Sequence, residues 1–267
     1  MKATENKFKR ALAAGVPQFG LWAALADPYV TELLATAGFD WLLVDNEHAP
    51  NDVRSTLAQL QAIASYESQA IVRPVKSETA LIKQFLDIGA QTLLLPMIDT
   101  EEQAREAVAA TRYPPEGVRG VGSALARASR WNKIPAYLTT AADELCILVQ
   151  AETVRSLSNL EAIASVDGVD GVFFGPSDLS ASMGLLGKPG DSKVREAIRD
   201  GIDTVRKAGK AAGVLAPDEA FAREYMEAGA SFVAVGTDTG LLSSAAAQLA
   251  AKYKATDSAT KSEKGGY

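Results

Sequence analysis

Two acidic residues that each follow a short apolar run, Glu152 and Asp178, are candidates for holding a metal ion. The chain contains one histidine, His48, and one cysteine, Cys146. This composition excludes zinc sites with several histidines, CxxC redox pairs, iron–sulfur clusters and internal disulfides. Two carboxylates, completed by water and substrate oxygens, suit Mg²⁺ or Mn²⁺. The alternative is that both are acidic residues at helix N-termini, where such side chains are common.

A second group of reactive side chains lies in the segment Asp45-Asn46-Glu47-His48. Asp45 precedes His48 by three residues and could orient the imidazole for acid–base chemistry, although a lone loop histidine is more often solvated. Arg73 follows an apolar run, and an arginine there needs an anionic partner. That partner could be Asp45 or Glu47, or else an anionic substrate or its developing oxyanion.

Two further features could complete a binding site around these residues. Gln150 lies two residues before Glu152, so both side chains point to the same face of an extended strand. The sequence from Gly175 to Leu179, GPSDL, predicts a tight turn into a helix start. Free backbone N–H groups in such a turn could bind a carboxylate, although many strand-to-helix turns look similar.

The elements that must position these residues are eight short apolar runs separated by segments with helical periodicity, such as 53–64 and 79–88. Continuous apolar runs are typical of parallel strands that are covered on both faces. Several helical segments end at a glycine before the next run, as at Gly38, Gly89 and Gly229, which is typical of helix C-caps. The eight runs are Phe19–Trp22, Trp41–Val44, Ala70–Val72, Thr92–Leu95, Cys146–Val149, Val172–Phe174, Ala212–Leu215 and Phe232–Val235.

This alternation predicts an α/β fold, a (β/α)8 TIM barrel formed by residues 1–254 as a single domain. A doubly wound open sheet is the structural alternative, but the first run is not followed by GxGxxG. In a barrel, the candidate residues would share the rim at the carboxyl ends of the strands. The long segment 113–143 is predicted to belong to the mouth or to an interface, and residues 255–267 are predicted to be a disordered tail.

Charge and hydropathy restrict the partners of the chain. Its 27 basic and 33 acidic residues give a net charge of −6, which argues against nucleic-acid binding. No apolar stretch reaches the roughly 18 to 20 residues that span a bilayer, so no membrane association is expected. We expect a cytoplasmic protein that acts on small molecules.

Several long segments resemble the HpcH/HpaI family of metal-dependent pyruvate aldolases. The most specific feature is the pair DxEH, from Asp45 to His48, and GPSDLS, from Gly175 to Ser180, at this separation. The resemblance extends from about residue 19 to residue 253. It includes AGFDWLLVDNEHAPND, RPVKSETALIKQFLDIGAQTLLLPM, ATRYPPEGVRGVGSALARASRWN, QAET and DGVFFGPSDLSASMG.

The resemblance implies a class II aldolase that cleaves 4-hydroxy-2-oxo acids, such as 4-hydroxy-2-oxoheptanedioate, to pyruvate and an aldehyde such as succinic semialdehyde. Glu152 and Asp178 would bind Mn²⁺, Mg²⁺ or Co²⁺, with Gln150 beside them. The backbone amides of Gly175 and Ser177 would hold the pyruvate carboxylate.

The resemblance also implies roles in catalysis and assembly. Arg73 would stabilise the enolate oxygen. His48, paired with Asp45, would take part in proton transfer, with either the imidazole or a metal-bound water as the proton acceptor. The family forms homohexamers, as dimers of trimers. Asp87 would therefore approach a neighbouring subunit's site, and the C-terminal helix around 241–252 would exchange between subunits. Trp22 and Leu215 would line the aldehyde side of the pocket.

Three alternatives remain open at this stage. A class I aldolase would need a lysine buried in a strand for a Schiff base, but the apolar runs contain none and Lys76 lies just past the third. A non-catalytic barrel could bind a carboxylate ligand without turnover. Another C–C lyase of the same superfamily could act on a different hydroxy-oxo acid or sugar acid.

Overall fold

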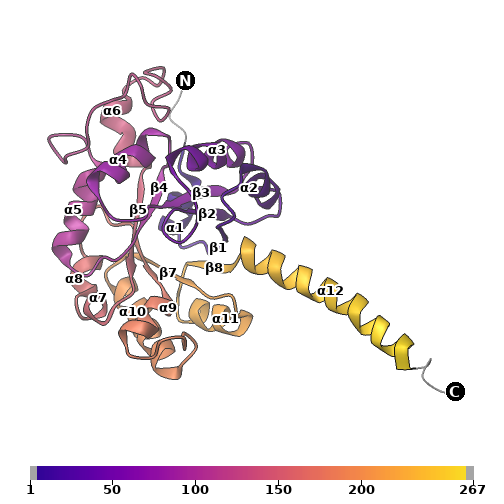
Figure 1. Cartoon of the computed structure of the whole chain (residues 1–267). Coiled ribbons are helices and arrows are strands. Elements are labelled where there is room, and N and C mark those ends of the chain that lie inside the picture. The colour runs from indigo at the N-terminus through magenta and orange to yellow at the C-terminus, as the bar shows by residue number, and fades with distance from the viewer. Residues whose placement is uncertain (1–4, 263–267) are drawn as a thin grey trace.

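Eight parallel strands form a closed barrel in which each strand pairs with its sequence neighbours and β8 returns to pair with β1 (Figure 1). In this computed structural model the residues described are 5–262, with side chains described for 5–254. Each predicted apolar run lies within one strand, so the predicted TIM barrel is confirmed. The strands are β1 (Gln18–Ala23), β2 (Trp41–Asp45), β3 (Gln69–Arg73), β4 (Thr92–Leu95), β5 (Cys146–Ala151), β6 (Gly171–Phe174), β7 (Ala211–Leu215) and β8 (Phe232–Thr237).

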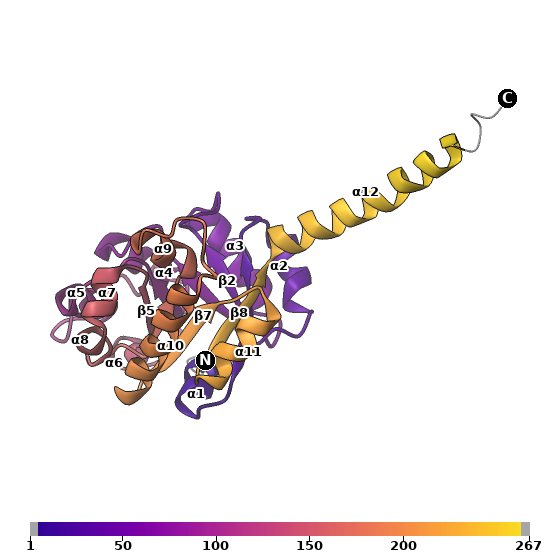
Figure 2. The ribbon, with the colours of Figure 1, turned by 90° about the horizontal axis from the view of Figure 1, so that it is seen from below.

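Helices alternate with the strands and form the outer layer of the barrel (Figures 1 and 2). Capping boxes begin three of the described helices, with Asp52 capping α3, Thr100 capping α5 and Thr153 capping α7. The helices are α1 (Lys7–Ala13), α2 (Pro28–Ala35), α3 (Val53–Ile63), α4 (Thr79–Asp87), α5 (Glu101–Thr111), α6 (Tyr137–Thr140), the 3-10 helix η1 (Ala141–Glu144), α7 (Val154–Ser158), α8 (Leu160–Ala164), α9 (Pro176–Ser182), α10 (Ser192–Lys207), α11 (Glu219–Glu227) and α12 (Asp238–Ser262).

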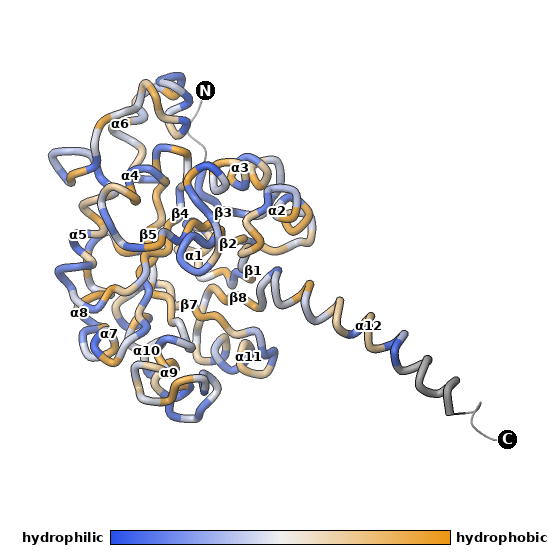
Figure 3. The backbone as a smooth tube through the Cα atoms, in the orientation of Figure 1, coloured by the Kyte–Doolittle hydropathy of each residue, from blue (hydrophilic) through white to orange (hydrophobic). Residues whose placement is uncertain are grey.

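The strands are apolar on both faces because each face meets its own core. Alternate residues such as Leu43 and Phe173 point into the barrel interior, whereas Leu42 and Val44 pack against the helices. Figure 3 shows the resulting concentration of hydrophobic residues along the strands. The predicted helix-ending residues Gly38, Gly89 and Gly229 have φ of +91°, +104° and +105°. This left-handed conformation explains the choice of glycine.

Helix α1 closes the amino-terminal end of the barrel. Phe8 is fully buried, with its ring centroid 6.1 Å from that of Trp41 and 5.9 Å from that of Phe232. Asn6 caps the helix and donates side-chain hydrogen bonds to Thr92 Oγ1 and to the Glu144 carbonyl. The barrel interior is therefore sealed at this end, and only the opposite rim is available for chemistry that uses interior residues.

The segment 113–143 lies at the amino-terminal end of the barrel, because it connects the end of α5 to the start of β5. It consists mainly of turns, followed by α6 and η1. The prediction that it forms part of the mouth is therefore wrong, since the mouth is at the carboxyl ends of the strands. Its alternative role at an interface stays a prediction.

Helix α12 leaves the carboxyl end of β8 and projects away from the barrel in both views (Figures 1 and 2). Its large apolar side chains Leu241, Leu242, Leu249 and Tyr253 are exposed in this single chain. The backbone of α12 continues through 255–262 of the predicted tail, and 263–267 lie outside the described residues. Within the described range, none of the helices has the length and apolar character of a membrane span.

Candidate active site at the carboxyl rim

The strongest ion pair at the rim joins the ends of two neighbouring strands. Asp45 ends β2, Arg73 ends β3, and the strand register places the two residues opposite each other. Arg73 Nε donates to Asp45 Oδ1 at 2.8 Å, and Nη2 donates to Oδ2 at 2.7 Å. Both side chains are buried, with 6% and 2% of their surfaces exposed. A bidentate pair of this kind fixes the plane of the guanidinium.

The electrostatics of Asp45 follow from this pairing. Burial alone would raise its pKa, but the hydrogen bonds and charge of Arg73, together with two backbone hydrogen bonds, outweigh burial and lower the pKa below its ordinary value. The backbone N–H groups of Glu47 and His48 also donate to Asp45 Oδ1, at 3.0 and 3.5 Å. Asp45 is therefore an ionised anchor that organises the start of the loop after β2.

The structure corrects the expected pairing of Asp45 with the His48 imidazole. Among the described residues, the Asp45 carboxylate accepts hydrogen bonds from Arg73 and from the backbone N–H groups of Glu47 and His48, and none from the His48 imidazole. The His48 side chain is 65% exposed, and its Nε2 lies 4.0 Å from Glu47 Oε2. That carboxylate also forms an ion pair with Arg73 Nη1 at 2.9 Å.

Glu47 is a functional candidate that was not predicted from the sequence. The sequence indicated it only as a possible ion-pair partner of Arg73. The pKa of Glu47 is raised, chiefly by burial, with contributions from the charges of Asp45 and Asp178. The charges of Arg73 and His48 oppose this shift. The DxEH motif could have indicated this role, because it places Glu47 in the same short segment as Asp45 and His48.

Glu152 lies immediately beyond β5 and is 2% exposed. The backbone N–H of Met97 donates to its Oε1 at 2.9 Å, and the side-chain amide of Gln150 donates to its Oε2. Burial, and then the charges of Glu47 and Asp178, raise the pKa of Glu152 to about 7. The predicted shared orientation of Gln150 and Glu152 is confirmed by their hydrogen bond.

The loop after β6 brings Asp178 to the same rim. Asp178 lies in the first turn of α9, is exposed, and contributes to the raised pKa of both Glu47 and Glu152. Gly175 is the N-cap of α9, and a Cβ there would lie 2.7 Å from Glu152 Oε2. Ser177 is exposed in the first turn, where backbone N–H groups have no intrahelical partner.

Apolar side chains form the floor beneath Arg73. Its Cζ atom lies 5.3 Å from the ring centroid of Trp22, the last but one residue of β1, which points into the barrel. Leu215 ends β7 and packs, half-buried, against the same interior cluster. The structure therefore brings both predicted aldehyde-side residues to the level of the rim.

Asp87 is the one predicted site residue that the structure places elsewhere. It ends α4, close to the amino-terminal start of β4, and its Oδ1 accepts a hydrogen bond from Arg119 Nη2 at 2.8 Å. Arg119 is fully buried. Asp87 thus does not join the rim of its own barrel, and its contribution to a neighbouring subunit's site stays a prediction.

The model of the HpcH/HpaI aldolase/citrate lyase family matches residues 18–245. The chain belongs to this family. A hydroxypyruvate/pyruvate aldolase of Paraburkholderia phytofirmans is 79% identical over 98% of each chain. A 4-hydroxy-2-oxo-heptane-1,7-dioate aldolase of Salmonella dublin is 60% identical over 94% of this chain and 95% of its own. These similarities identify the chain as a carbon–carbon lyase.

Solved structures give the same result for the fold. A protein of the HpcH/HpaI family from Burkholderia cenocepacia superposes with a TM-score of 0.90 at 39% identity. The alignment covers 93% of this chain and 99% of that one. An HpcH/HpaI aldolase from Desulfitobacterium hafniense has a TM-score of 0.86 at 29% identity, over 92% and 96% of the two chains.

The donor set at the rim of this family member fits a hard divalent cation. Glu152 is a buried carboxylate with two further carboxylates close enough to raise its pKa, and a cation would relieve that repulsion. The candidate ligands are oxygens, which Mg²⁺ and Mn²⁺ prefer. Among residues 5–254, no group of three or more His, Cys, Asp or Glu side chains forms a complete metal cage.

Proposed function

We propose that this chain is a divalent-metal-dependent class II aldolase that cleaves 4-hydroxy-2-oxo acids reversibly to pyruvate and an aldehyde. The observation that carries the proposal is the convergence of Glu152, Asp178 and Arg73 at one rim. In cleavage, the 4-hydroxyl loses a proton and the C3–C4 bond breaks. Its electron pair moves into the 2-oxo group to give an enolate. Protonation of C3 then completes the pyruvate methyl group.

Glu152 and Asp178 are the residues that would hold the cation. Mn²⁺, Mg²⁺ or Co²⁺ bound there would act as a Lewis acid on the 2-oxo group. Met97 and Gln150 orient Glu152 by donating one hydrogen bond to each of its oxygens. The backbone N–H groups of Gly175 and Ser177 would bind the substrate carboxylate, because helix starts favour anions.

Arg73 is proposed to stabilise the negative charge that develops on the 2-oxo oxygen. Its guanidinium is already fixed by Asp45 and Glu47 and rests on Trp22, so little reorganisation is needed during the reaction. Preorganised donors of this kind contribute strongly to catalysis, and removing one typically costs about 10²- to 10³-fold in rate.

His48 is proposed to take part in proton transfer, with Glu47 as its charged neighbour. The exposed imidazole can exchange protons with solvent, and its Nε2 lies 4.0 Å from Glu47 Oε2. Trp22 and Leu215 would contact the aldehyde portion of the substrate. The eight strands contain no lysine, and Lys76 beyond β3 is exposed, which disfavours a Schiff-base mechanism.

The proposed substrates follow the two kinds of named relatives. The Salmonella relatives, at 60% identity, carry the name of a 4-hydroxy-2-oxo-heptane-1,7-dioate aldolase, so that diacid is one candidate and succinic semialdehyde its aldehyde product. The 79% identical relative is named for hydroxypyruvate and pyruvate, which favours a second candidate in which hydroxypyruvate replaces pyruvate as the nucleophile. The same rim would serve both reactions.

We also propose a cytoplasmic homohexamer, a dimer of trimers, in which α12 exchanges between subunits and Asp87 approaches a neighbouring site. The exposed apolar residues of α12 support exchange. Asp87 lies away from the rim of its own barrel, and this position supports a contribution to the site of another subunit.

Condensation assays test the proposed reaction. Pyruvate and hydroxypyruvate should each be consumed with a panel of aldehydes that includes succinic semialdehyde, and initial rates would rank the pairs. His48→Ala should lower these rates about 10²- to 10⁴-fold while the fold is retained. Borohydride added with pyruvate should leave the mass of the chain unchanged. A covalent adduct, or no condensation with any pair, would contradict the proposal.

A further inference from the structure

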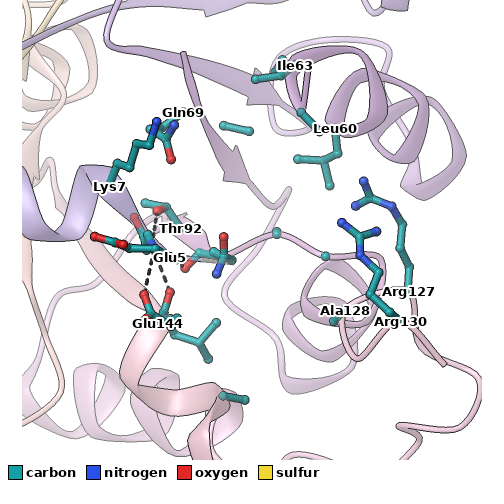
Figure 4. Close-up of a pocket in the computed structure, with 18 of the residues that line it drawn as sticks. Glu5, Lys7, Leu60, Ile63, Gln69, Thr92, Arg127, Ala128, Arg130 and Glu144 are labelled. Carbon is teal, nitrogen blue, oxygen red and sulfur yellow. Dashed lines mark hydrogen bonds between the residues drawn. The ribbon is translucent and has the colours of Figure 1, made fainter. Parts of the chain in front are cut away.

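A cavity lies at the end of the barrel opposite the rim. Its volume is about 320 Å³, and its lining includes Gln69 at the start of β3 and Thr92 at the start of β4. Segment 113–143 contributes Arg127 and Arg130 (Figure 4). The cavity therefore shares no residue with the candidate active site.

The charged side chains of this cavity fall into two groups. Glu5 and Glu144 both form ion pairs with Arg10, and Lys7 pairs with Glu67 at 2.6 Å. These partners lie around one end of the cavity. Figure 4 shows the guanidinium groups of Arg127 and Arg130 next to each other at the other end.

Within the described part of the chain, Arg127 and Arg130 form no ion pair. The arginines that do pair with carboxylates are Arg10, Arg73, Arg105, Arg119, Arg195, Arg199 and Arg223. Both residues are nevertheless half-buried, and burial together with the charge of Arg130 lowers the pKa of Arg127. Two adjacent, partly buried cations without counter-charge repel each other, and an anion between them would remove that repulsion.

The backbone holds both side chains in place. Arg127 Nη1 donates to the carbonyl of Ile88 at 2.8 Å and lies against Gly89, where an added Cβ would be 2.5 Å away. Arg130 begins three consecutive non-glycine residues with positive φ, at +50°, +54° and +63°. Such left-handed backbone is uncommon outside glycine, and it clusters at binding sites where it fixes side chains.

We propose that the cavity binds a small oxyanion, such as phosphate or a short carboxylate, between Arg127 and Arg130. Paired guanidinium groups suit these ligands because each can donate two parallel hydrogen bonds to adjacent oxygens. The cavity is large enough for an anion of this size. Binding would hold the two arginines of segment 113–143 together beside the end of α4, which Arg127 already contacts, and thereby stabilise the folded chain.

Isothermal titration of the full-length protein with inorganic phosphate, and separately with succinate, tests the site at constant ionic strength. We expect one saturable site per chain for at least one of the two anions, and the preferred anion identifies the oxyanion. The melting temperature should rise by about 3 °C when that anion is at ten times its Kd.

Two variants and a control locate the binding. Arg130→Asn keeps a residue that tolerates left-handed backbone, so it should fold normally but bind the anion at least tenfold more weakly. Arg127→Gln should have the same effect on affinity. Arg105→Gln removes an exposed arginine outside the cavity and should leave binding unchanged.

The proposal would be overturned by three outcomes. Neither anion binds the native protein saturably, or both variants retain the native number of sites and affinity. The third is that Arg130→Asn changes the oligomeric state while anion binding stays intact, because the two arginines would then serve a contact with a second copy of the chain.

Discussion

The guanidinium of Arg73 lies among three acidic residues at the rim. It contacts Asp45 and Glu47 directly, and its charge opposes the rise in the pKa of Glu152. The contact with Asp45 depends on the planar geometry of the guanidinium, because Asp45 accepts two parallel hydrogen bonds from it. A lysine would keep the charge but could not reproduce this arrangement.

Arg73→Lys should therefore lower kcat by about 10²- to 10³-fold, because the donor to the developing oxyanion is misplaced. Steady-state kinetics of pyruvate release would measure the change. Arg195→Lys is the matched control, since Arg195 is also paired with a carboxylate, at 2.7 Å, and lies over an aromatic ring in the outer helical layer. Activity of Arg73→Lys within twofold of the native enzyme would remove Arg73 from the mechanism.

The sequence was sufficient to place most rim residues and to name Asp45 and Glu47 as candidate partners of Arg73, but not to predict the surroundings of His48. Arg73, Gln150 and Glu152 lie at or just beyond the carboxyl ends of strands, so topology alone brings them to one rim. The interaction between Asp45 and His48 was predicted from proximity in sequence. The register of β2 and β3 instead presents Arg73 to both oxygens of Asp45, and such cross-strand competition is not visible in spacing.

At the scale of elements, the turn from β6 to α9 is shaped around Glu152. Gly175 has an ordinary φ of −97°, so its requirement for glycine comes from space and not from backbone conformation. A Cβ would lie 2.7 Å from Glu152 Oε2 and 3.0 Å from Gln150 Nε2. Any side chain here must displace a buried carboxylate.

Gly175→Ala should lower activity by about 10²-fold or more while leaving the far-ultraviolet circular dichroism spectrum unchanged, since small displacements of catalytic groups are costly. Gly120→Ala is the control, because its added Cβ meets only the flexible Lys83 side chain, at 3.3 Å. Native activity in Gly175→Ala would show that the position of Glu152 is unimportant.

Segment 113–143 provides a prediction for alkaline stability. Burial of Tyr113 raises its pKa to about 12, and its hydroxyl has no hydrogen-bond partner among the described residues. The unfolded chain loses this proton near pH 10, so the stability associated with Tyr113 is present below pH 10 and is lost as pH rises towards 12.

Tyr113→Phe should match the native protein in stability at pH 7 and be about 1 kcal/mol more stable than it at pH 11. Urea unfolding of both proteins at the two pH values would measure this difference. A difference that does not change between pH 7 and pH 11 would contradict the raised pKa.

The eight strands and the ends of several helices could be predicted because apolar runs and terminal glycines depend on local chemistry. The closure of the barrel by α1 was not predicted. Phe8 acts through contacts with Trp41 and Phe232, which are distant in the chain. Segment 113–143 connects a helix to the next strand, and this connectivity places it at the amino-terminal end of the barrel. The prediction that the segment forms part of the mouth did not take this constraint into account.

At the scale of the whole molecule, α12 is the helix whose apolar side chains a single chain leaves exposed to solvent. Its exposed leucines and Tyr253 extend along a helix that projects from the barrel (Figure 2). Exposed apolar surface of this extent is typical of protein contacts.

Light scattering coupled to size exclusion should give a mass about six times the 28.1 kDa of one chain. Ending the chain after Gly240 removes most of α12 and should yield a smaller assembly with an intact barrel by circular dichroism. A native protein that elutes as a monomer, or a shortened chain that still forms hexamers, would contradict helix exchange.

The central claim is that Glu152 and Asp178 hold a divalent cation required for aldol cleavage. The most direct measurement is pyruvate release from a 4-hydroxy-2-oxo acid by protein treated with EDTA and then supplied with Mg²⁺, Mn²⁺ or Co²⁺. We predict that chelation abolishes release, that at least one cation restores it, and that Glu152→Gln is not restored at the same concentration. Full activity of the metal-free protein would contradict the account.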